Sequence, residues 1–296
     1  MVPDGRSPAP GVLLDRCARV LGHAELVADR SASHGEAVVL ELAGPRGVRW
    51  IAKHARREKK YRQELTAYVE WVPALGAAAP ALHSAHDDLR LLVLSRLPGR
   101  PVEGTPAERE PEVHRQAGAL TRRLHDGATP RADAAFAGDL ARRLERYAAR
   151  AESLLTGEEI AFARARVAAL AARPPVTTVP CHLDNQPRNW LADEHGGLSL
   201  IDFGNAARRP WIWDLASLWL RVRPGAPALA DAFLAGYGRV PTDDDWLEFE
   251  SCAAFLGLST VVWAAEHGDP RFAQEGRRWL RDLMAARGRG VTGECW

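Results

Sequence analysis

The chain has 296 residues, enough for two domains or two lobes around a shared cleft. Hydrophobic residues make up 46% and charged residues 26%, which is typical of a globular protein and excludes a disordered or fibrous class. The net charge of +1 gives no electrostatic basis for binding nucleic acid or a membrane surface, and we expect neither as a partner.

The cysteines and the N-terminal segment bear on the cellular compartment. The four cysteines are far apart and form no Cys-x-x-Cys pair, so we expect reduced thiols. Residues 1–11 contain Pro, Gly and Ser but no apolar run of the kind that a secretory signal needs. We therefore predict a cytoplasmic protein, and the sequence leaves open whether it is a monomer or a homodimer.

The first third of the chain predicts a helix followed by a small antiparallel sheet. Residues 12–21 alternate apolar and charged side chains with helical spacing. Residues 37–42 and 48–53 read as strands, and residues 43–47 between them have the Gly-Pro composition of a turn. A helix is expected over residues 58–75, with the basic cluster at residues 56–60 solvating one of its faces.

Lys53, at the end of the second of these strands, is unusual in this chain. Only Lys53, Lys59 and Lys60 are lysines among 39 basic residues, and arginine is used elsewhere. A lysine here indicates a need for a compact ammonium charge. The alternative is a strand-end lysine that simply reaches solvent.

The rest of the chain, apart from residues 181–204, is predicted to contain one extended segment followed by a series of helices. Residues 91–102 form an apolar strand that runs into a Pro-Gly break, as expected at a boundary between lobes. Apolar spacing predicts helices at residues 112–125, 136–155, 158–172, 214–222, 227–237, 243–267 and 271–286. Two prolines at residues 174 and 175 end the third of these helices, and residues 176–180 lead into the next segment.

Residues 181–204 carry the chemistry. They read as two short apolar strands joined by a turn at residues 195–197, with polar side chains just before the first strand and just after the second. Asp184, Asn189 and Asp202 thereby come to one end of a hairpin. In phosphoryl transfer one carboxylate orients the attacking hydroxyl, while oxygen ligands hold Mg²⁺, so these three side chains fit that reaction. An ordinary strand-to-turn junction is the alternative for either half of the pattern alone.

The pattern His182-x-Asp184-x-x-x-x-Asn189, followed by Asp202-Phe203-Gly204, resembles the catalytic and metal signature of kinase-like enzymes. The later segment Trp213-Asp214-Leu215-Ala216 resembles the aminoglycoside phosphotransferase and choline kinase family, over about residues 30 to 285. The resemblance implies an α+β, protein-kinase-like bilobal fold. Its parts would be an N-terminal nucleotide-binding lobe at residues 1–94, a hinge at residues 95–99 and a larger helical lobe at residues 100–296.

The resemblance also assigns roles. It makes Asp184 the catalytic base and Asn189 and Asp202 the Mg²⁺ ligands. Lys53 would contact the phosphates of ATP, with GTP possible, and Glu64 would orient Lys53, with Glu58 and Glu70 as alternatives. The nucleotide would further contact Ser33 and Gly35, and Ser95 and Leu97, whose backbone would face the base.

The acceptor is less specified. The implied reaction is ATP- and Mg²⁺-dependent phosphorylation of a small-molecule hydroxyl, with an aminoglycoside-like or peptide antibiotic as first choice and resistance by inactivation as its role. A Ser or Thr hydroxyl of a peptide, or another natural-product intermediate, is the alternative acceptor. A nucleotide-binding module without turnover is a third reading.

The sequence departs from the family pattern in the catalytic loop. Leu183 and Arg188 stand where the family usually has glycine, and Asn205 stands where many relatives carry an acid. A cationic acceptor would find candidate ligands among Asp243, Asp244, Asp245, Glu248, Glu250, Glu266 and Asp269.

Overall fold

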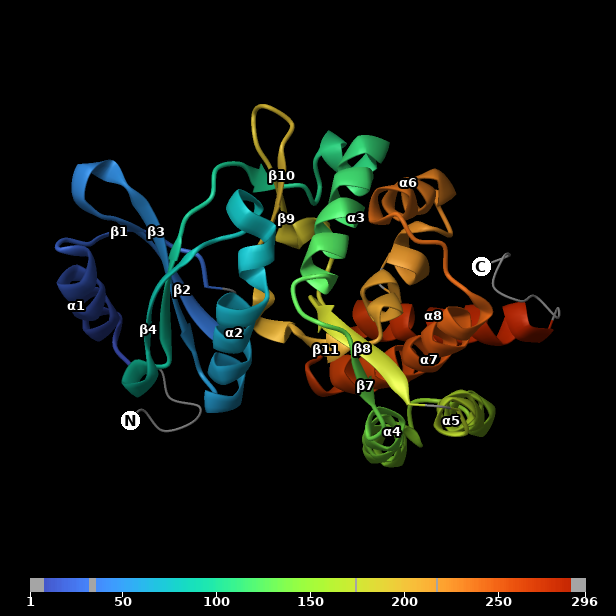
Figure 1. Cartoon of the computed structure of the whole chain (residues 1–296). Coiled ribbons are helices and arrows are strands. Elements are labelled where there is room, and N and C mark those ends of the chain that lie inside the picture. The colour runs from blue at the N-terminus through green and yellow to red at the C-terminus, as the bar shows by residue number, and fades with distance from the viewer. Residues whose placement is uncertain (1–7, 32–35, 174, 217, 289–296) are drawn as a thin grey trace. The chain divides into compact units, whose positions relative to one another are not determined.

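A computed structural model describes residues 8–31, 36–173, 175–216 and 218–288 (Figure 1). The chain divides into two compact units. The first consists of Met1–Ala128 together with His182–Ala207, and the second of Thr129–Cys181 together with Arg208–Trp296. The predicted catalytic hairpin thus belongs to the same unit as the N-terminal sheet.

The first unit is built on a five-stranded antiparallel sheet. Its strand order is β1-β2-β3-β5-β4, with β1 at Glu25–Asp29, β2 at Ala37–Ala43, β3 at Arg49–Ala55, β4 at Leu82–His86 and β5 at Leu91–Ser95. The strands predicted at residues 37–42 and 48–53 are confirmed as β2 and β3. Sequence analysis missed β1 and β4, because both are five-residue strands at the sheet edges with several exposed positions.

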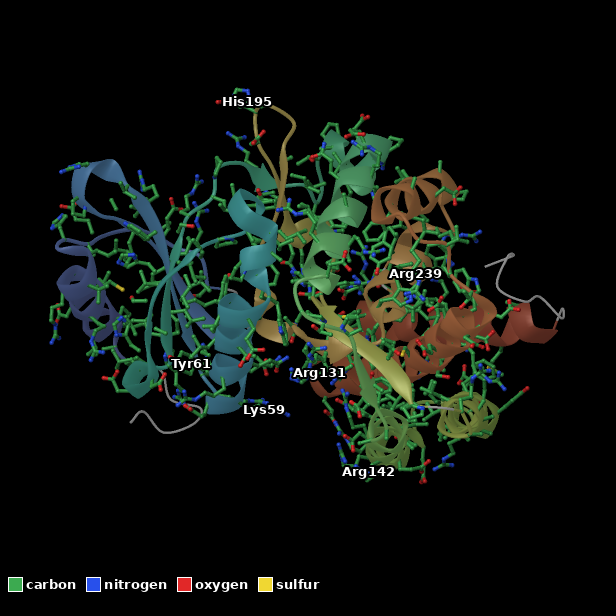
Figure 2. The ribbon with its side chains drawn as sticks, in the orientation of Figure 1. Lys59, Tyr61, Arg131, Arg142, His195 and Arg239 are labelled. Atoms are coloured by element: carbon green, nitrogen blue, oxygen red, sulfur yellow. The ribbon has the colours of Figure 1, made fainter. Side chains whose placement is uncertain are left out.

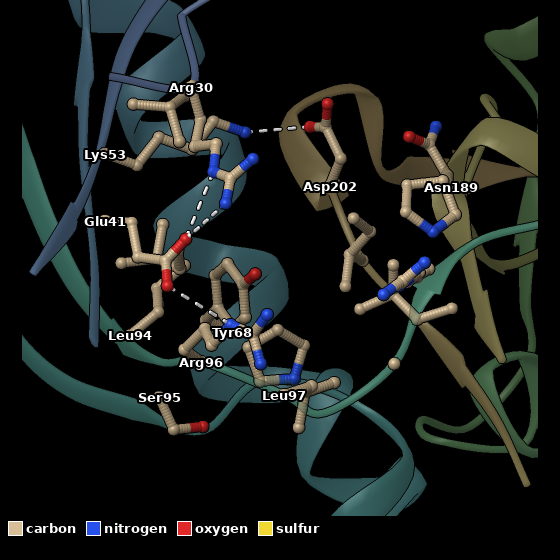
Figure 3. A pocket seen from close by; sticks show the side chains of 18 of the residues that line it. Arg30, Glu41, Lys53, Tyr68, Leu94, Ser95, Arg96, Leu97, Asn189 and Asp202 are labelled. Carbon is tan, nitrogen blue, oxygen red and sulfur yellow. Dashed lines mark hydrogen bonds and ion pairs between the residues drawn. The ribbon is translucent and has the colours of Figure 1, made fainter. Parts of the chain in front are cut away.

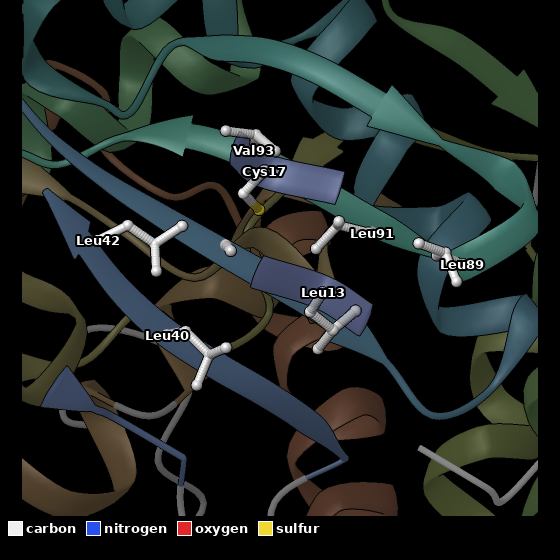
Figure 4. Close-up of a cluster of buried hydrophobic side chains, with 8 residues drawn as sticks. Leu13, Cys17, Leu40, Leu42, Leu89, Leu91 and Val93 are labelled. Carbon is white, nitrogen blue, oxygen red and sulfur yellow. The ribbon is translucent and has the colours of Figure 1, made fainter. Parts of the chain in front are cut away.

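One face of this sheet is apolar and is covered by α1 (Pro10–Leu21), which confirms the first predicted helix. Leu13 and Cys17 of α1 pack on Leu40, Leu42 and neighbouring side chains of β3 and β5 (Figure 4). All members of this cluster are buried. Because side chains alternate across a strand, the residues between them point to the opposite face.

The opposite face carries polar side chains. Val39 pairs with Lys53 across β2 and β3, and Glu41 pairs with Ile51 in the same register. The helix that follows, α2, spans Glu58–Glu70 and is shorter than predicted. Residues 72–78 form a 3₁₀ segment instead, since Pro73 has no backbone N–H to continue the α-helix.

The rest of the first unit holds the hairpin. It contains β6 (Arg100–Pro101), α3 (Pro111–His125), β9 (Trp190–Ala192) and β10 (Leu198–Leu200), and its second sheet has the order β10-β9-β6. The predicted hairpin is confirmed, with His195 at its tip (Figure 2). Gly99 has φ +96°, and a Cβ there would lie 2.6 Å from the carbonyl oxygen of Ala192, so only glycine permits this approach.

The second unit is mainly helical. Its elements are β7 (Arg131–Asp133), α4 (Phe136–Ala151), α5 (Gly157–Ala171), β8 (Val176–Cys181), β11 (Ala207–Arg209), α6 (Pro227–Tyr237), α7 (Asp243–Glu266) and α8 (Pro270–Gly288). The strands form a small sheet of order β11-β8-β7. The predicted helix at residues 214–222 is wrong as an α-helix: a 3₁₀ turn (Trp211–Leu215) and a π-helical turn (Leu218–Val222) occupy this region.

The helix α7 is the central element of the second unit. It packs against α4, α5 and α8. By length and composition alone it is the one helix among the described residues that would suffice to cross a bilayer, but 72% of its most apolar window is buried within the structure. Such burial is what the core helix of a globular unit shows.

Candidate active site

A cavity of about 620 Å³ lies on the polar face of the sheet, entirely within the first unit (Figure 3). Its wall combines strands β2, β3 and β5, the segment after β5, and the catalytic hairpin. The predicted residues that line it are Lys53, Glu64, Ser95, Leu97, Asn189 and Asp202. Residues separated by about 150 positions in the sequence are thus brought to one cavity.

Lys53 forms the centre of an ion-pair triad. Its Nζ lies 2.8 Å from Glu64 Oε1 and 2.8 Å from Asp202 Oδ1. Burial alone would lower the pKa of Lys53, but the two carboxylates outweigh it and the pKa is raised. Burial raises the pKa of Glu64, whereas the Lys53 charge lowers the pKa of Asp202 to about 2. The Glu64 side chain is 3% exposed and that of Asp202 48%, so Glu64 is placed to hold Lys53 while Asp202 is reachable by a ligand.

The Asp202-Phe203-Gly204 turn is held in a specific conformation. Asp202 has φ +64°, a left-handed value that is uncommon outside glycine, and its Oδ1 accepts a hydrogen bond from the Gly204 amide at 3.3 Å. Phe203 is fully buried and packs edge-on against Tyr68, with ring centroids 5.5 Å apart. A Cβ on residue 204 would lie 3.2 to 3.4 Å from Asp202, Glu64 and Lys53, so glycine leaves room for the triad.

Asn189 and Asp202 each keep one oxygen available for a metal. The Asn189 amide nitrogen donates to the Asp184 carbonyl at 2.8 Å and to Asp184 Oδ2 at 2.9 Å. This orientation leaves Asn189 Oδ1 without a protein partner among the described residues, and the same holds for Asp202 Oδ2. Both residues line the one cavity. Two uncommitted oxygens suit a hard cation such as Mg²⁺.

Asp184 is tied down by three donors. Arg188 approaches its two carboxylate oxygens at 2.8 and 3.0 Å, and Gln186 and Asn189 donate as well. Arg188, which replaces a family glycine, therefore turns back onto the predicted base. Leu183, the residue before Asp184, has φ +63°, a backbone conformation that glycine adopts without strain.

The loop is anchored from behind by buried polar groups. His182 is fully buried, and its Nε2 lies 2.9 Å from the Ile201 carbonyl oxygen. Asn185 joins two other elements: it donates to Thr121 Oγ1 of α3 and accepts from Trp190 Nε1, both at 2.7 Å. These bonds fix the loop between α3 and β9, so Asp184 projects from a braced backbone.

The end of the cavity away from Asp202 is lined by the predicted hinge. The Ser95 amide donates to the Ala81 carbonyl at 2.9 Å, and the Ser95 hydroxyl accepts from the Ala81 amide at 2.9 Å. The Arg96 amide is likewise bonded, to the Arg49 carbonyl at 3.2 Å. Within the described part of the chain the Leu97 amide has no such partner, which makes it the available donor. The predicted contacts Ser33 and Gly35 lie outside the described residues.

Sequence analysis missed a charged cluster in this cavity. Glu41, 6% exposed, lies 2.8 Å from Arg30 and 3.5 Å from Arg96, both of which line the cavity with it (Figure 3). Arg49 approaches Glu41 to 3.7 Å. Arg30 is the largest cause that lowers the pKa of Glu41. The sequence signal was a single acid inside the apolar strand Ala37–Ala43, which is costly unless paired.

Comparison with known proteins identifies the family. A sequence model described as "Phosphotransferase enzyme family" matches residues 29–250. The chain belongs to this phosphotransferase family. It is thus an enzyme of the small-molecule kinase class, which confirms the sequence-based prediction. No curated protein sequence matches the chain.

Solved structures place this phosphotransferase in the protein-kinase-like fold. Macrolide 2'-phosphotransferase MphH from Brachybacterium faecium is 18% identical, with 91% of this chain and 97% of that chain covered and a TM-score of 0.64. The GDP and kanamycin complex of APH(2")-IIia is 15% identical, with 90% of this chain and 96% of that chain covered and a TM-score of 0.67. Choline kinase LicA from Streptococcus pneumoniae is 16% identical, with 92% of this chain and 98% of that chain covered and a TM-score of 0.64. The predicted α+β, kinase-like fold class is confirmed.

The acids suggested for a cationic acceptor lie in the second unit, and most are already engaged there. Asp245 accepts the backbone amide of Thr242, the N-cap residue of α7, at 2.8 Å and pairs with Arg239 at 2.8 Å. Glu250 pairs with Arg166 at 3.2 Å, and Glu266 with Arg150. Asp244 contacts Arg173, and Asp269 accepts the Phe272 amide at 2.9 Å. These contacts reduce the number of carboxylates that a cationic acceptor would find unpaired.

Proposed function

We propose that this phosphotransferase transfers the terminal phosphate of a nucleoside triphosphate, ATP or GTP, to a hydroxyl group of a small molecule in the cytoplasm. The supporting observation is the joint placement of Lys53, Glu64, Asn189 and Asp202 around one cavity, with one uncommitted oxygen on each of Asn189 and Asp202. A hinge at residues 95–99 would offer the Leu97 amide to the base.

Each side chain has a distinct task in this proposal. Lys53, held by Glu64, binds phosphate oxygens through its ammonium group. Asn189 and Asp202 would hold Mg²⁺, which supplies neutralisation of the charge on the transferred phosphate. Asp184 orients the acceptor hydroxyl and takes its proton. Because Arg188 covers both carboxylate oxygens of Asp184, the acceptor must share or displace the Arg188 contact.

For the acceptor, an antibiotic of aminoglycoside or peptide type is our first choice, with inactivation of the antibiotic as the outcome. The structural relatives include proteins named for macrolide and aminoglycoside phosphorylation and for choline kinase activity. A peptide Ser or Thr hydroxyl, or a biosynthetic intermediate, is the alternative acceptor. The intact set of Lys53, Asp184, Asn189 and Asp202 argues against a binding module without turnover, since binding alone has no need of a base.

The test is phosphate transfer read by mass spectrometry. The enzyme is incubated with Mg²⁺ and ATP or GTP against aminoglycosides, macrolides, peptide antibiotics, choline and Ser- or Thr-containing peptides. We expect one acceptor class to gain a single phosphoryl mass. Asp184→Ala should lower that turnover by about 10²–10⁴, the contribution of a positioned acid–base group.

Two results would contradict the proposal. Near-normal turnover by Asp184→Ala on a confirmed acceptor would remove Asp184 from the mechanism. Nucleotide binding with no transfer to any acceptor class, and no hydrolysis above the Asp184→Ala background, would favour the binding-module reading instead.

A further inference from the structure

Lys59 and Lys60 are adjacent in the sequence but differ in environment. Lys60 precedes Glu64 by four residues in α2, so the two side chains share one helix face. The Lys60 side chain is 27% exposed, whereas Lys59 is an exposed residue at the surface of α2 (Figure 2). The expectation that residues 56–60 solvate a helix face is therefore correct for Lys59 and wrong for Lys60.

A second cavity, of about 290 Å³, adjoins the first. The two cavities share the lining residues Arg30, Val39, Lys53, Glu64 and Asp202. The first also includes the hinge residues Ser95 and Leu97, while the second instead includes Lys60 and Asn205. Going from the hinge past Lys53 and Asp202, the next cation lining the continuous space is thus Lys60.

Lys60 is held at the wall of this second cavity. Its Nζ lies 2.5 Å from Asn205 Oδ1 and 3.3 Å from Glu36 Oε2. Gln63, on the same face of α2, donates to the carbonyl oxygens of Asn205 at 2.8 Å and Ala206 at 2.9 Å. Because Asn205 is neutral, the half-exposed Glu36 is the only carboxylate in ion-pair contact with Lys60 among the described residues.

The order of these groups matches the order of groups in a nucleoside triphosphate. A base at the hinge and inner phosphates at Lys53 leave the terminal phosphate to extend into the second cavity. A lysine ammonium is a compact charge with three donors, which suits a phosphate that must leave during the reaction. Two of the three lysines in this arginine-rich chain line that path.

We propose that Lys60 is a second phosphate-binding lysine, which contacts the terminal phosphate of the nucleotide donor. The inference rests on the proposed nucleotide-dependent function and adds a residue to it. On binding, Lys60 exchanges its contact with Glu36 for a phosphate oxygen and keeps its bond to Asn205. The contact discriminates triphosphate from diphosphate, because only the terminal phosphate would extend past Lys53 to Lys60.

The test compares affinities for ATP and ADP in the presence of Mg²⁺, by calorimetric titration of the full chain. Lys60→Met should weaken ATP binding by about tenfold or more relative to ADP, as expected for loss of a charge-assisted hydrogen bond. Lys59→Met is the matched control and should leave the ATP to ADP ratio at the wild-type value. Lys60→Arg, which keeps the charge, should retain most of the discrimination. The same set is repeated with GTP and GDP.

The possible failures are distinguishable. If Lys60→Met leaves the ratio of ATP affinity to ADP affinity at the wild-type value, whether or not both affinities fall, the inference is overturned. Lys60 would then only stabilise the segment after Asp202. If the wild-type chain binds neither ATP nor GTP with Mg²⁺, the proposed function fails and takes the inference with it.

Discussion

The two faces of the five-stranded sheet are built from the same strands but serve different ends. The face under α1 is apolar and buried, with Leu40 and Leu42 from β2. The other face, offset by one residue, presents Val39, Glu41 and Lys53 to the cavity. A one-residue alternation therefore separates the packed face from the face that lines the cavity, and the effects of substitutions on the two faces should be separable by experiment.

The largest effect is expected from the α1 face. Leu40 is 1% exposed, and Leu40→Ala would remove buried contacts and leave a cavity. We expect the free energy of unfolding to fall by about 2–5 kcal/mol, while nucleotide affinity well below the melting temperature stays unchanged. Denaturant unfolding and titration measure the two quantities. Leu26→Ala, at a position 48% exposed, is the control and should change stability by no more than about 0.5 kcal/mol.

The opposite pattern is expected on the cavity face. Lys53→Arg keeps the positive charge beside Glu64 and Asp202, so the buried carboxylates remain compensated. The larger planar guanidinium cannot reproduce a single ammonium 2.8 Å from each carboxylate. Turnover should fall by about 10²-fold, with little change in melting temperature. A loss of stability comparable to that of Leu40→Ala, without loss of turnover, would show that the cavity face is structural.

The smallest expected effect is in the second unit, where a buried carboxyl group should make the stability of the fold depend on pH. Burial raises the pKa of Glu248 from 4.5 to about 7. Between these values the unfolded chain loses a proton that the folded chain keeps, so this residue destabilises the fold as pH rises through that window. Glu248→Gln should raise the melting temperature at pH 8 and leave it unchanged near pH 4. Glu194→Gln is the control: its side chain is 87% exposed, and we expect no change in melting temperature at either pH.

The sequence predicted the parts of the site that depend on local spacing. Asp184, Asn189 and Asp202 could be placed together because a short hairpin joins them, and β2 and β3 followed from apolar runs around a Gly-Pro turn. Lys53 stood out because lysine is rare in this chain. The spacing signals are each contained in fewer than about 30 consecutive residues, so local periodicity suffices to read them, whereas the rarity of lysine is read from the composition of the whole chain.

The rest of the site depends on contacts that no local pattern contains. The Ser95 amide bonding to Ala81 and Lys60 reaching Asn205 both follow from tertiary packing. Glu41 was readable as an acid in an apolar strand, but its arginine partners come from separate elements. The roles assigned to individual side chains, and the lobe boundary at residues 95–99, stay predictions.

The most direct measurement of the central claim is the Mg²⁺ dependence of nucleotide binding in the wild-type chain and in Asp202→Ala. The Asp202 carboxylate stays ionised above its pKa of about 2 and has one uncommitted oxygen, so it is ready to hold a metal at neutral pH. We predict that Mg²⁺ strengthens ATP or GTP binding to the wild-type chain and has no such effect on Asp202→Ala. Equal Mg²⁺ dependence in the two proteins would contradict the assignment of this cavity as the phosphate-transfer site.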